Sequence, residues 1–235
     1  MRAAIVIPTY NEALYIEKLI SQILYLHPDF DILVVDDNSP DGTGKILDKL
    51  SGKSERIKVL HRGKKSGLGR AYVAGFMYIL SSNNYYDRII QMDADFSHDP
   101  KYLIDLINAT ESNDISLGSR YILGGRIARW NLFRKMISYT ANIYARSLLG
   151  LKINDCTSGF RCFRREALNN IGLETIESNG YLFQVEVLKR CSRLGFSLQE
   201  VPIVFIEREY GKTKFSFHDI WEAFWGIMQL SLLKS

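Results

Sequence analysis

The sequence has no long apolar run. None of its stretches approaches the roughly 20 uninterrupted apolar residues that a membrane-spanning helix needs, and the most apolar one, residues 224–233, is interrupted by Gln229 and Ser231. These features predict a protein that does not cross a membrane. The first residues lead directly into a strand pattern without a cleavage signal, so we also expect no secretory peptide.

Cysteine is scarce, and the charge is nearly balanced. Cys156, Cys162 and Cys191 are odd in number and form no Cys-x-x-Cys pair, which favours reduced thiols in a cytoplasmic protein over disulfides or a zinc site. The net charge of +4 comes from 30 basic and 26 acidic residues. This excess is too small to indicate a nucleic-acid partner, and we expect none.

The composition is that of a globular protein. Hydrophobic residues make up 46% and charged residues 24% of the 235 positions, which excludes a disordered, collagen-like or coiled-coil chain. No repeat or long linker divides the sequence. We therefore predict a single domain over residues 1–235.

The first half of the sequence alternates short apolar runs with helical patterns. Unbroken apolar runs are typical of strands buried on both faces of a parallel sheet, and they occur at residues 3–7, 32–35, 57–60, 88–92 and 114–117. Helical patterns lie between them at residues 12–27, 41–51, 67–82 and 100–108. This order predicts an α/β fold: a mainly parallel twisted sheet with helices on both faces.

The second half is less regular. Its patterns predict helices over residues 131–149 and 181–194, then a strand over 198–206 and a final helix over 218–233. The final helix has a broad aromatic face that includes Phe224 and Trp225. Such a face suits either core packing or a position in a membrane interface, and the sequence leaves both open.

Two aspartates follow the fourth predicted strand. Ligands of open parallel sheets bind beyond the carboxyl ends of the strands, where Asp93 and Asp95 are expected to lie. Adjacent carboxylates repel each other unless a cation neutralises them, and their oxygen atoms suit Mg²⁺ or Mn²⁺. The pair therefore predicts a metal site, with a solvated acidic turn as the alternative.

A third acid and a glycine-rich segment bear on nucleotide binding. Asp37 ends the second strand and can accept hydrogen bonds from a ribose or a base, although the sequence at 39–42 also suits a turn. Residues 63–70 fit neither the Walker loop nor the dinucleotide fingerprint, so kinase-like and dehydrogenase functions lose support. Within this segment, the glycines of residues 67–69 suit either a close approach of the backbone to a ligand or a plain tight turn.

Cationic side chains gather in the second half. Arg134, Ser138 and Asn142 recur every four residues and share one face of the predicted helix. Because guanidinium matches phosphate oxygens in a fork, this face could bind a phosphate, although an ordinary solvated face is equally compatible. Arg208 and Lys214 lie in a basic loop that could close over a pyrophosphate, or could bind nothing.

Together these segments resemble glycosyltransferase family 2, and more narrowly the dolichol-phosphate (polyprenol-phosphate) mannose synthases. The resemblance rests on PTYNE at 8–12, DDNSPDGT at 36–43 and DAD at 93–95. Further segments follow in matching order: GLG at 67–69, GSRY at 118–121, the helix face with residues 134, 138 and 142, and TSGFR at 157–161. The resemblance therefore extends over nearly the whole chain.

The resemblance implies a GT-A (Rossmann-like) fold that binds GDP-mannose with a divalent cation. It implies a nucleoside site formed by Pro8, Tyr10, Glu12, Val35 and Asp37. The metal and diphosphate would contact Asp93, Ala94 and Asp95, and the loop over the donor would carry Arg208 and Lys214. The lipid phosphate would face Arg120, Arg134 and Ser138. Some members have a further metal ligand, a glutamine, where this chain has Ser97.

The implied reaction is inverting transfer of mannose to a polyprenyl (dolichyl) phosphate. A phosphate oxygen is already anionic at neutral pH, so direct displacement needs no dedicated base. This agrees with the histidines, which show no partner pattern: His27, His61, His98 and His218. The catalytic candidates are then Asp95, Arg120, Arg134 and Ser138. UDP-glucose or another nucleotide sugar is the alternative donor, and a non-catalytic nucleotide-binding module is the alternative from another class.

A lipid acceptor also implies a membrane partner. We expect a peripheral protein on the cytoplasmic face of a membrane. Without a spanning segment in this sequence, the contact would be made by the final helix, by a membrane subunit, or by both.

Overall fold

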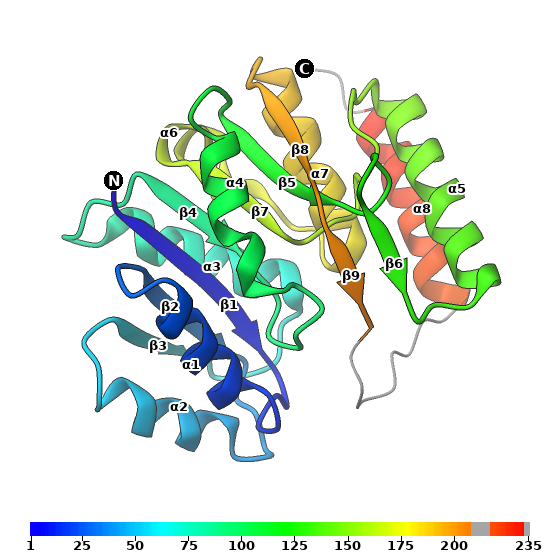
Figure 1. The fold of residues 1–235 in the computed structure, drawn as a ribbon. Helices are drawn as coiled ribbons and strands as arrows, with labels where there is room; N and C mark the ends of the chain where they lie inside the picture. Colours follow the sequence, from blue (N-terminus) through cyan, green and yellow to red (C-terminus); the bar gives the residue numbers. More distant parts are fainter. Residues whose placement is uncertain (208–216, 233–235) are drawn as a thin grey trace.

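The structure is a computed structural model that describes residues 1–207 and 217–232, with side chains for 1–207 and 224–232. Its centre is a seven-stranded sheet in the order β3-β2-β1-β4-β7-β5-β8. The strands are β1 (Ala3–Thr9), β2 (Asp31–Asp36), β3 (Ile57–His61), β4 (Arg88–Gln91), β5 (Ile115–Ser119), β7 (Arg161–Arg164) and β8 (Leu198–Pro202). All run parallel except β7, which pairs antiparallel with both β4 and β5. Figure 1 shows this order across the molecule.

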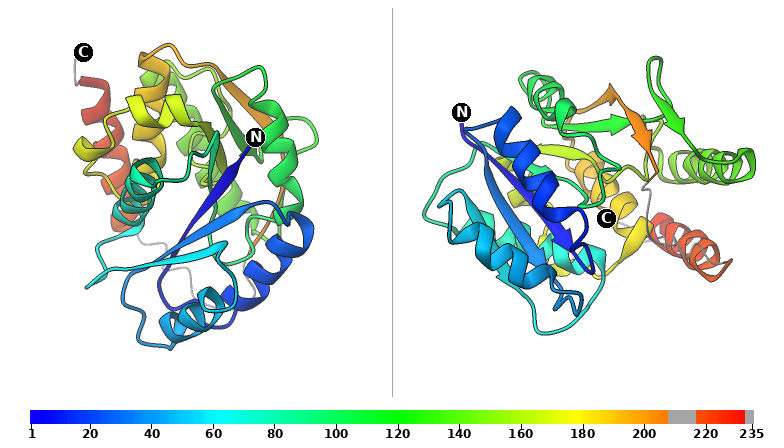
Figure 2. Two further views of the ribbon diagram at one scale, coloured as in Figure 1. Left: turned by 90° about the vertical axis from the view of Figure 1, so that its left-hand side faces the viewer. Right: turned by 60° about the horizontal axis from the view of Figure 1, so that its bottom comes forward.

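Helices cover both faces of the sheet, which confirms the predicted α/β architecture (Figures 1 and 2). One face carries α1 (Ile16–Leu26), α2 (Thr43–Ser51), the short 3₁₀ helix Pro100–Tyr102 and α4 (Leu103–Ala109). The other carries α3 (Leu68–Ser81), α6 (Arg165–Asn170), the 3₁₀ helix Leu173–Thr175 and α7 (Gly180–Arg193).

The alternation of side chains along β1 explains why its apolar run is unbroken. Ile5 and Ile7 pack into the cluster under α1 and α4, whereas Ala4 and Val6 pack into the cluster under α3 and α7. Every residue of β1 and β2 is buried. A strand covered on both faces gains from apolar residues at every position, which is the pattern seen here.

Two elements near the C-terminus differ from the prediction. The strand expected over 198–206 divides into β8 and β9 (Val204–Ile206), and β9 pairs with β6 (Arg126–Ala128) in a separate two-stranded sheet. The break falls after Pro202, which has no backbone N–H for the ladder, and the next residue, Ile203, is buried. The sequence analysis also missed β7, whose terminal arginines obscure its apolar centre.

Two long helices from the second half of the chain pack against each other beside the sheet. They are α5 (Leu132–Leu149) and α8 (Phe217–Leu232), and the rings of Tyr144 and Phe224 stack between them at 4.7 Å. Ile227 of α8 is 5% exposed, whereas Trp225 is 44% exposed. Over its described side chains, α8 therefore contributes both to the core and to an exposed apolar surface.

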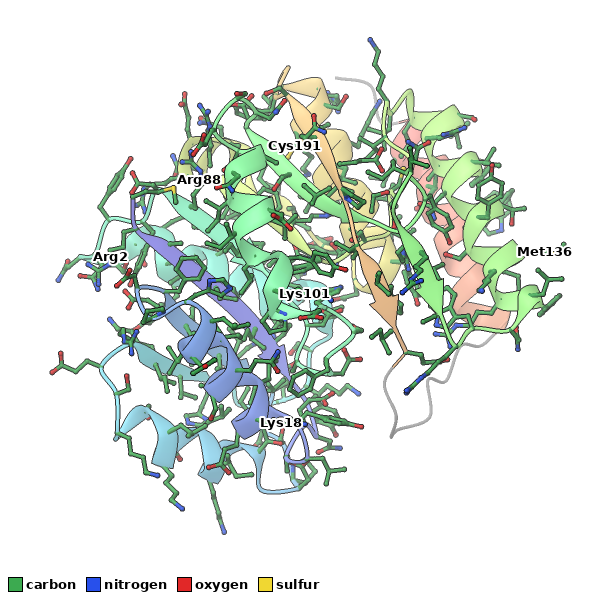
Figure 3. All side chains as sticks on the ribbon, viewed as in Figure 1. Arg2, Lys18, Arg88, Lys101, Met136 and Cys191 are labelled. Atoms are coloured by element: carbon green, nitrogen blue, oxygen red, sulfur yellow. The ribbon has the colours of Figure 1, made fainter. Side chains whose placement is uncertain are left out.

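The outer face of α5 is strongly apolar. Leu132, Phe133, Met136 and Tyr139 are each more than half exposed, and Met136 projects outward in Figure 3. Within the described part of the chain, no helix is both long and apolar enough to cross a membrane.

Candidate active site

The predicted polar clusters meet at one edge of the sheet. β1, β2, β4 and β5 are parallel, so the segments that follow them leave the sheet at the same end. The antiparallel β7 brings residues 155–160, which precede it, to that same end. The N–H of Gly118 donates to the carbonyl of Phe160 at 2.8 Å, which joins the two segments.

A cavity of about 170 Å³ opens at this edge. Its lining includes four residues predicted for the site, Asp93, Asp95, Arg120 and Arg134. The acids and the arginines come from different elements, and the fold places them around one volume. The remaining lining residues are Ser97, His98, Trp130, Thr157, Ser158, Gly159, Tyr181, Phe205 and Glu207.

Local hydrogen bonds orient the two acids. The hydroxyl of Tyr72 donates to Asp93 Oδ1 at 2.6 Å, and the N–H of Ser97 donates to Asp95 Oδ1 at 3.1 Å. Burial, reinforced by Asp93, raises the pKa of Tyr72 well above its usual value, so its hydroxyl stays a donor. Phe96 has a positive φ of 61°, a conformation of the kind that costs about 1–3 kcal/mol and clusters at functional sites.

The donor set fits a hard divalent cation. Mg²⁺ and Mn²⁺ prefer oxygen ligands and are commonly held by one or two carboxylates together with phosphate oxygens of the substrate. Asp93 and Asp95 supply such carboxylates on the cavity wall. Among the described residues no group of three His, Cys, Asp or Glu side chains gathers as a metal cage. Ala94 between them is buried in the core.

Arg120 is held by a buried carboxylate. Its Nε and Nη2 donate to the two oxygens of Asp155 at 2.7 and 2.6 Å, and Nη2 also donates to Thr157 Oγ1 at 2.7 Å. Asp155 is 0% exposed and Arg120 is 7% exposed. Burial alone would lower the pKa of Arg120, but the charge and hydrogen bonds of Asp155 raise it. The side chain is therefore a fixed cation on the cavity wall.

Arg134, which also lines the cavity, has two partners there. It forms an ion pair with Glu207, and its guanidinium lies 4.1 Å from the ring centre of Trp130. Along the same helix face, Asn142 is 1% exposed and accepts the N–H of Cys156 at 2.7 Å, so it fixes the 155–160 segment. Ser138, between them, is half-buried and does not line the cavity.

The predicted nucleoside residues lie at the ends of β1 and β2, apart from this cavity. Pro8 and Val35 are register partners in the sheet, and both are buried. Val35 packs in the core cluster under α3, so only its main chain could contact a ligand. Asp37 accepts hydrogen bonds from Arg62 at 2.8 Å and from the N–H of Ser66 at 3.1 Å.

The other two nucleoside candidates lie in the loop after β1. The ring of Tyr10 has the ammonium of Lys65 4.0 Å from its centre, and the N–H of Glu12 donates to Thr43 Oγ1 at 3.0 Å. These contacts join the loops after β1, β2 and β3. Arg208 and Lys214, predicted to lie over the donor, fall outside the described residues.

The glycines at 67–69 have a packing reason. A Cβ on Gly69 would lie 2.4 Å from the carbonyl oxygen of Ser178, and one on Gly67 would lie 2.6 Å from Asn179 Oδ1. Of the two alternatives from sequence, these contacts favour a tight turn that lets α3 begin against the segment before α7.

His98 is the functional candidate that the sequence analysis missed. It is 3% exposed, its Nδ1 accepts the backbone N–H of Asp93 at 3.0 Å, and its Nε2 lies 3.9 Å from Asp93 Oδ2. Burial lowers the pKa of its imidazole despite the neighbouring acids. Because its partner is a main-chain group, no pattern of side chains in the sequence could indicate it.

Comparison with known proteins identifies the class of this protein as a glycosyltransferase. Residues 4–172 match the glycosyl transferase family 2, and the chain belongs to that family. It is 44% identical over 233 residues to the polyprenol monophosphomannose synthase of Mycolicibacterium smegmatis, covering 96% of this chain and 87% of that protein. It is also 44% identical over 223 residues to the undecaprenyl-phosphate mannosyltransferase of Micrococcus luteus, with 95% and 91% covered. The resemblance to polyprenol-phosphate mannose synthases is thus confirmed.

Solved structures give the same fold. The chain superposes on glucosyl-3-phosphoglycerate synthase from Mycobacterium tuberculosis with a TM-score of 0.73 at 18% identity, covering all of this chain and 81% of that one. It superposes on a mannosyltransferase from Pyrobaculum calidifontis, solved with GDP-Man and Mn²⁺, with a TM-score of 0.59 at 16% identity, covering 94% and 59%. These similarities confirm the GT-A fold, and the chain is a glycosyltransferase.

Proposed function

We propose that the enzyme transfers mannose from GDP-mannose to a polyprenyl (dolichyl) phosphate, with inversion at the sugar carbon and with the help of Mg²⁺ or Mn²⁺. The mannosyl and polyprenyl parts of this proposal are supported by the names of the two relatives at 44% identity. The donor and the metal are supported by the GDP-Man and Mn²⁺ of the Pyrobaculum mannosyltransferase.

One observation carries the proposal: Asp93 and Asp95 line the same cavity as Arg120 and Arg134. Transfer between two phosphate groups requires two sites for negative charge, one for the leaving diphosphate and one for the accepting phosphate. The two acids would hold a cation at the first of these sites. The arginines match the oxygens of the second.

The residues of this chain act by binding and orienting. Asp155 fixes Arg120 through two hydrogen bonds, so the guanidinium is already in place when the acceptor phosphate arrives. Arg134 lies on the same cavity wall as Glu207, and the phosphate replaces that carboxylate as its partner. The phosphate oxygen attacks without losing a proton, so no side chain serves as a base. Asp93 and Asp95 would hold a divalent cation, which would supply positive charge for the departing diphosphate.

The acceptor makes a membrane surface the natural partner. The exposed apolar face of α5 lies next to Arg134, on the helix that carries it, and Trp225 and Leu232 of α8 are exposed nearby. Apolar side chains of this kind bind at the boundary of lipid headgroups. We propose peripheral binding at the cytoplasmic face, through these helices or through a membrane subunit.

The experiment is a transfer assay with labelled GDP-mannose, a polyprenyl phosphate and Mg²⁺ or Mn²⁺. We expect a β-linked mannosyl phosphoryl lipid, identified by NMR, and no product in chelator. Asp95→Ala should abolish transfer, whereas Asp105→Ala, at an exposed position of α4, should leave it unchanged. Transfer from UDP-glucose but not from GDP-mannose would contradict the proposed donor. An α-linked product would contradict the proposed inversion at the sugar carbon.

A further inference from the structure

The protonation of His98 is determined by its main-chain partner. A backbone N–H can only donate, so Nδ1, which lies 3.0 Å from the N–H of Asp93, must accept. An imidazole that accepts at Nδ1 carries its hydrogen on Nε2. His98 is therefore a neutral ring with one N–H left to donate.

The ring is fixed in one orientation. It stacks on Phe160 with 4.8 Å between centres and 8° between planes, and Phe205 meets it edge-on at 6.3 Å. Gly159 lies against the edge of the ring that carries Cε1, next to Nε2: a Cβ there would lie 3.4 Å from His98 Cε1 and 3.5 Å from Asp93 Oδ2. The edge that carries Nε2 thus shares the cavity wall with Gly159 and Asp93.

Within the described part of the chain, no acceptor lies at hydrogen-bond distance from His98 Nε2. The nearest carboxylate oxygen, Asp93 Oδ2, is 3.9 Å away, which is too long for a hydrogen bond. A single oxygen atom could bridge Nε2 and Oδ2 if it lay about 2.8 Å from each of them, with an angle of roughly 90° between the two hydrogen bonds. Such an atom must accept from Nε2–H and donate to Oδ2, which a hydroxyl does and an ionised phosphate oxygen does not.

We propose that His98 Nε2–H and Asp93 Oδ2 together bind one hydroxyl group of the transferred hexose, so that His98 is a sugar-recognition residue of the donor site. The same cavity is lined by Asp93, Arg120 and Arg134. The proposed function assigns the donor diphosphate to the acid and the acceptor phosphate to the arginines, so the hexose that passes between the two phosphates would lie in this cavity. This inference rests on the proposed function for the identity of the donor.

Two variants separate the tasks of the two ring nitrogens. In His98→Asn, the amide oxygen takes the place of Nδ1 and retains the bond from the N–H of Asp93, but nothing replaces Nε2–H. In His98→Gln, the longer amide can reach the position of Nε2 and donate there. We therefore expect His98→Asn to lose recognition of the sugar and His98→Gln to regain part of it.

The measurement is calorimetric binding of GDP and GDP-mannose in the presence of Mn²⁺. For His98→Asn we expect affinity for GDP-mannose to fall about 2- to 13-fold, the value of one neutral hydrogen bond, and affinity for GDP to stay unchanged. GDP-deoxymannoses lacking the C2, C3, C4 or C6 hydroxyl then identify the group. One of them should bind the wild type and His98→Asn equally.

Equal losses for GDP and GDP-mannose would overturn the inference, because His98 would then act only through Asp93. If His98→Asn binds every deoxy donor more weakly than the wild type does, no single sugar hydroxyl occupies the bridging position. That position would then be assigned to water, and this result would also overturn the inference. If His98→Asn does not fold, His98→Leu, which fills the space of the ring but has no side-chain N–H, takes its place in the same series. If the wild type binds UDP-glucose instead of GDP-mannose, the proposed donor is wrong. The role of His98 can then still be tested with UDP, UDP-glucose and the corresponding deoxyglucose donors.

Discussion

Replacing Asp155 by asparagine removes the charge that compensates Arg120. Both groups are almost completely buried, and Asp155 accepts three hydrogen bonds from Arg120, at 3.0, 2.7 and 2.6 Å. Breaking a buried pair by removing one charge costs about 3–5 kcal/mol, because the other charge stays buried without compensation. At about 2–4 °C per kcal/mol for a chain of this size, Tm should fall by roughly 6–20 °C.

The assay is thermal and denaturant unfolding of Asp155→Asn beside a matched exposed pair. Asp99→Asn weakens the 3.0 Å pair with Lys101, which is 57% exposed, and asparagine still caps the following turn, so we expect a loss below about 1 kcal/mol. Adding Arg120→Gln to Asp155→Asn should cost less than the sum of the single changes. Equal losses for Asp155→Asn and Asp99→Asn would refute the reasoning.

Two further predictions concern packing and thiol chemistry. A Cβ on Gly75 would lie 2.4 Å from Val6 Cγ1, so Gly75→Ala should lower the free energy of unfolding in a urea titration by about 1–3 kcal/mol. Gly63 has open space around it, so Gly63→Ala should change the free energy of unfolding little in the same titration. Burial raises the pKa of the thiols of Cys156, Cys162 and Cys191 to about 12, so at pH 8 none should react with a disulfide reagent until the protein unfolds. Rapid reaction in the native state would contradict the burial of these three side chains.

The first half of the fold could be predicted because each local pattern agrees with its final environment. The apolar run at 3–7 became β1, with alternate side chains on the two faces, and the acids at 93–95 followed β4 to the predicted edge of the sheet. A strand buried on both faces leaves an unbroken apolar signal in the sequence. Strand direction alone places the two acids at the carboxyl end of the sheet.

The rest depends on contacts between distant segments. Arg161 is 0% exposed, and the sequence around it indicates a polar loop because nothing local reveals that β4 and β5 enclose it. The place of Arg120 on the cavity wall was anticipated, but its buried partner, Asp155, was not. His98 was missed for the same reason, since a main-chain partner leaves no side-chain pattern.

The antiparallel strand β7 has a consequence for how the chain is made. During synthesis β1 to β4 can form before residues 161–164 exist, but β4 then has an unpaired edge beside the fully buried Ile89 and Ile90. Such an edge can pair with other chains and lead to aggregation. A nascent chain is therefore at risk until β7 arrives and bridges β4 to β5.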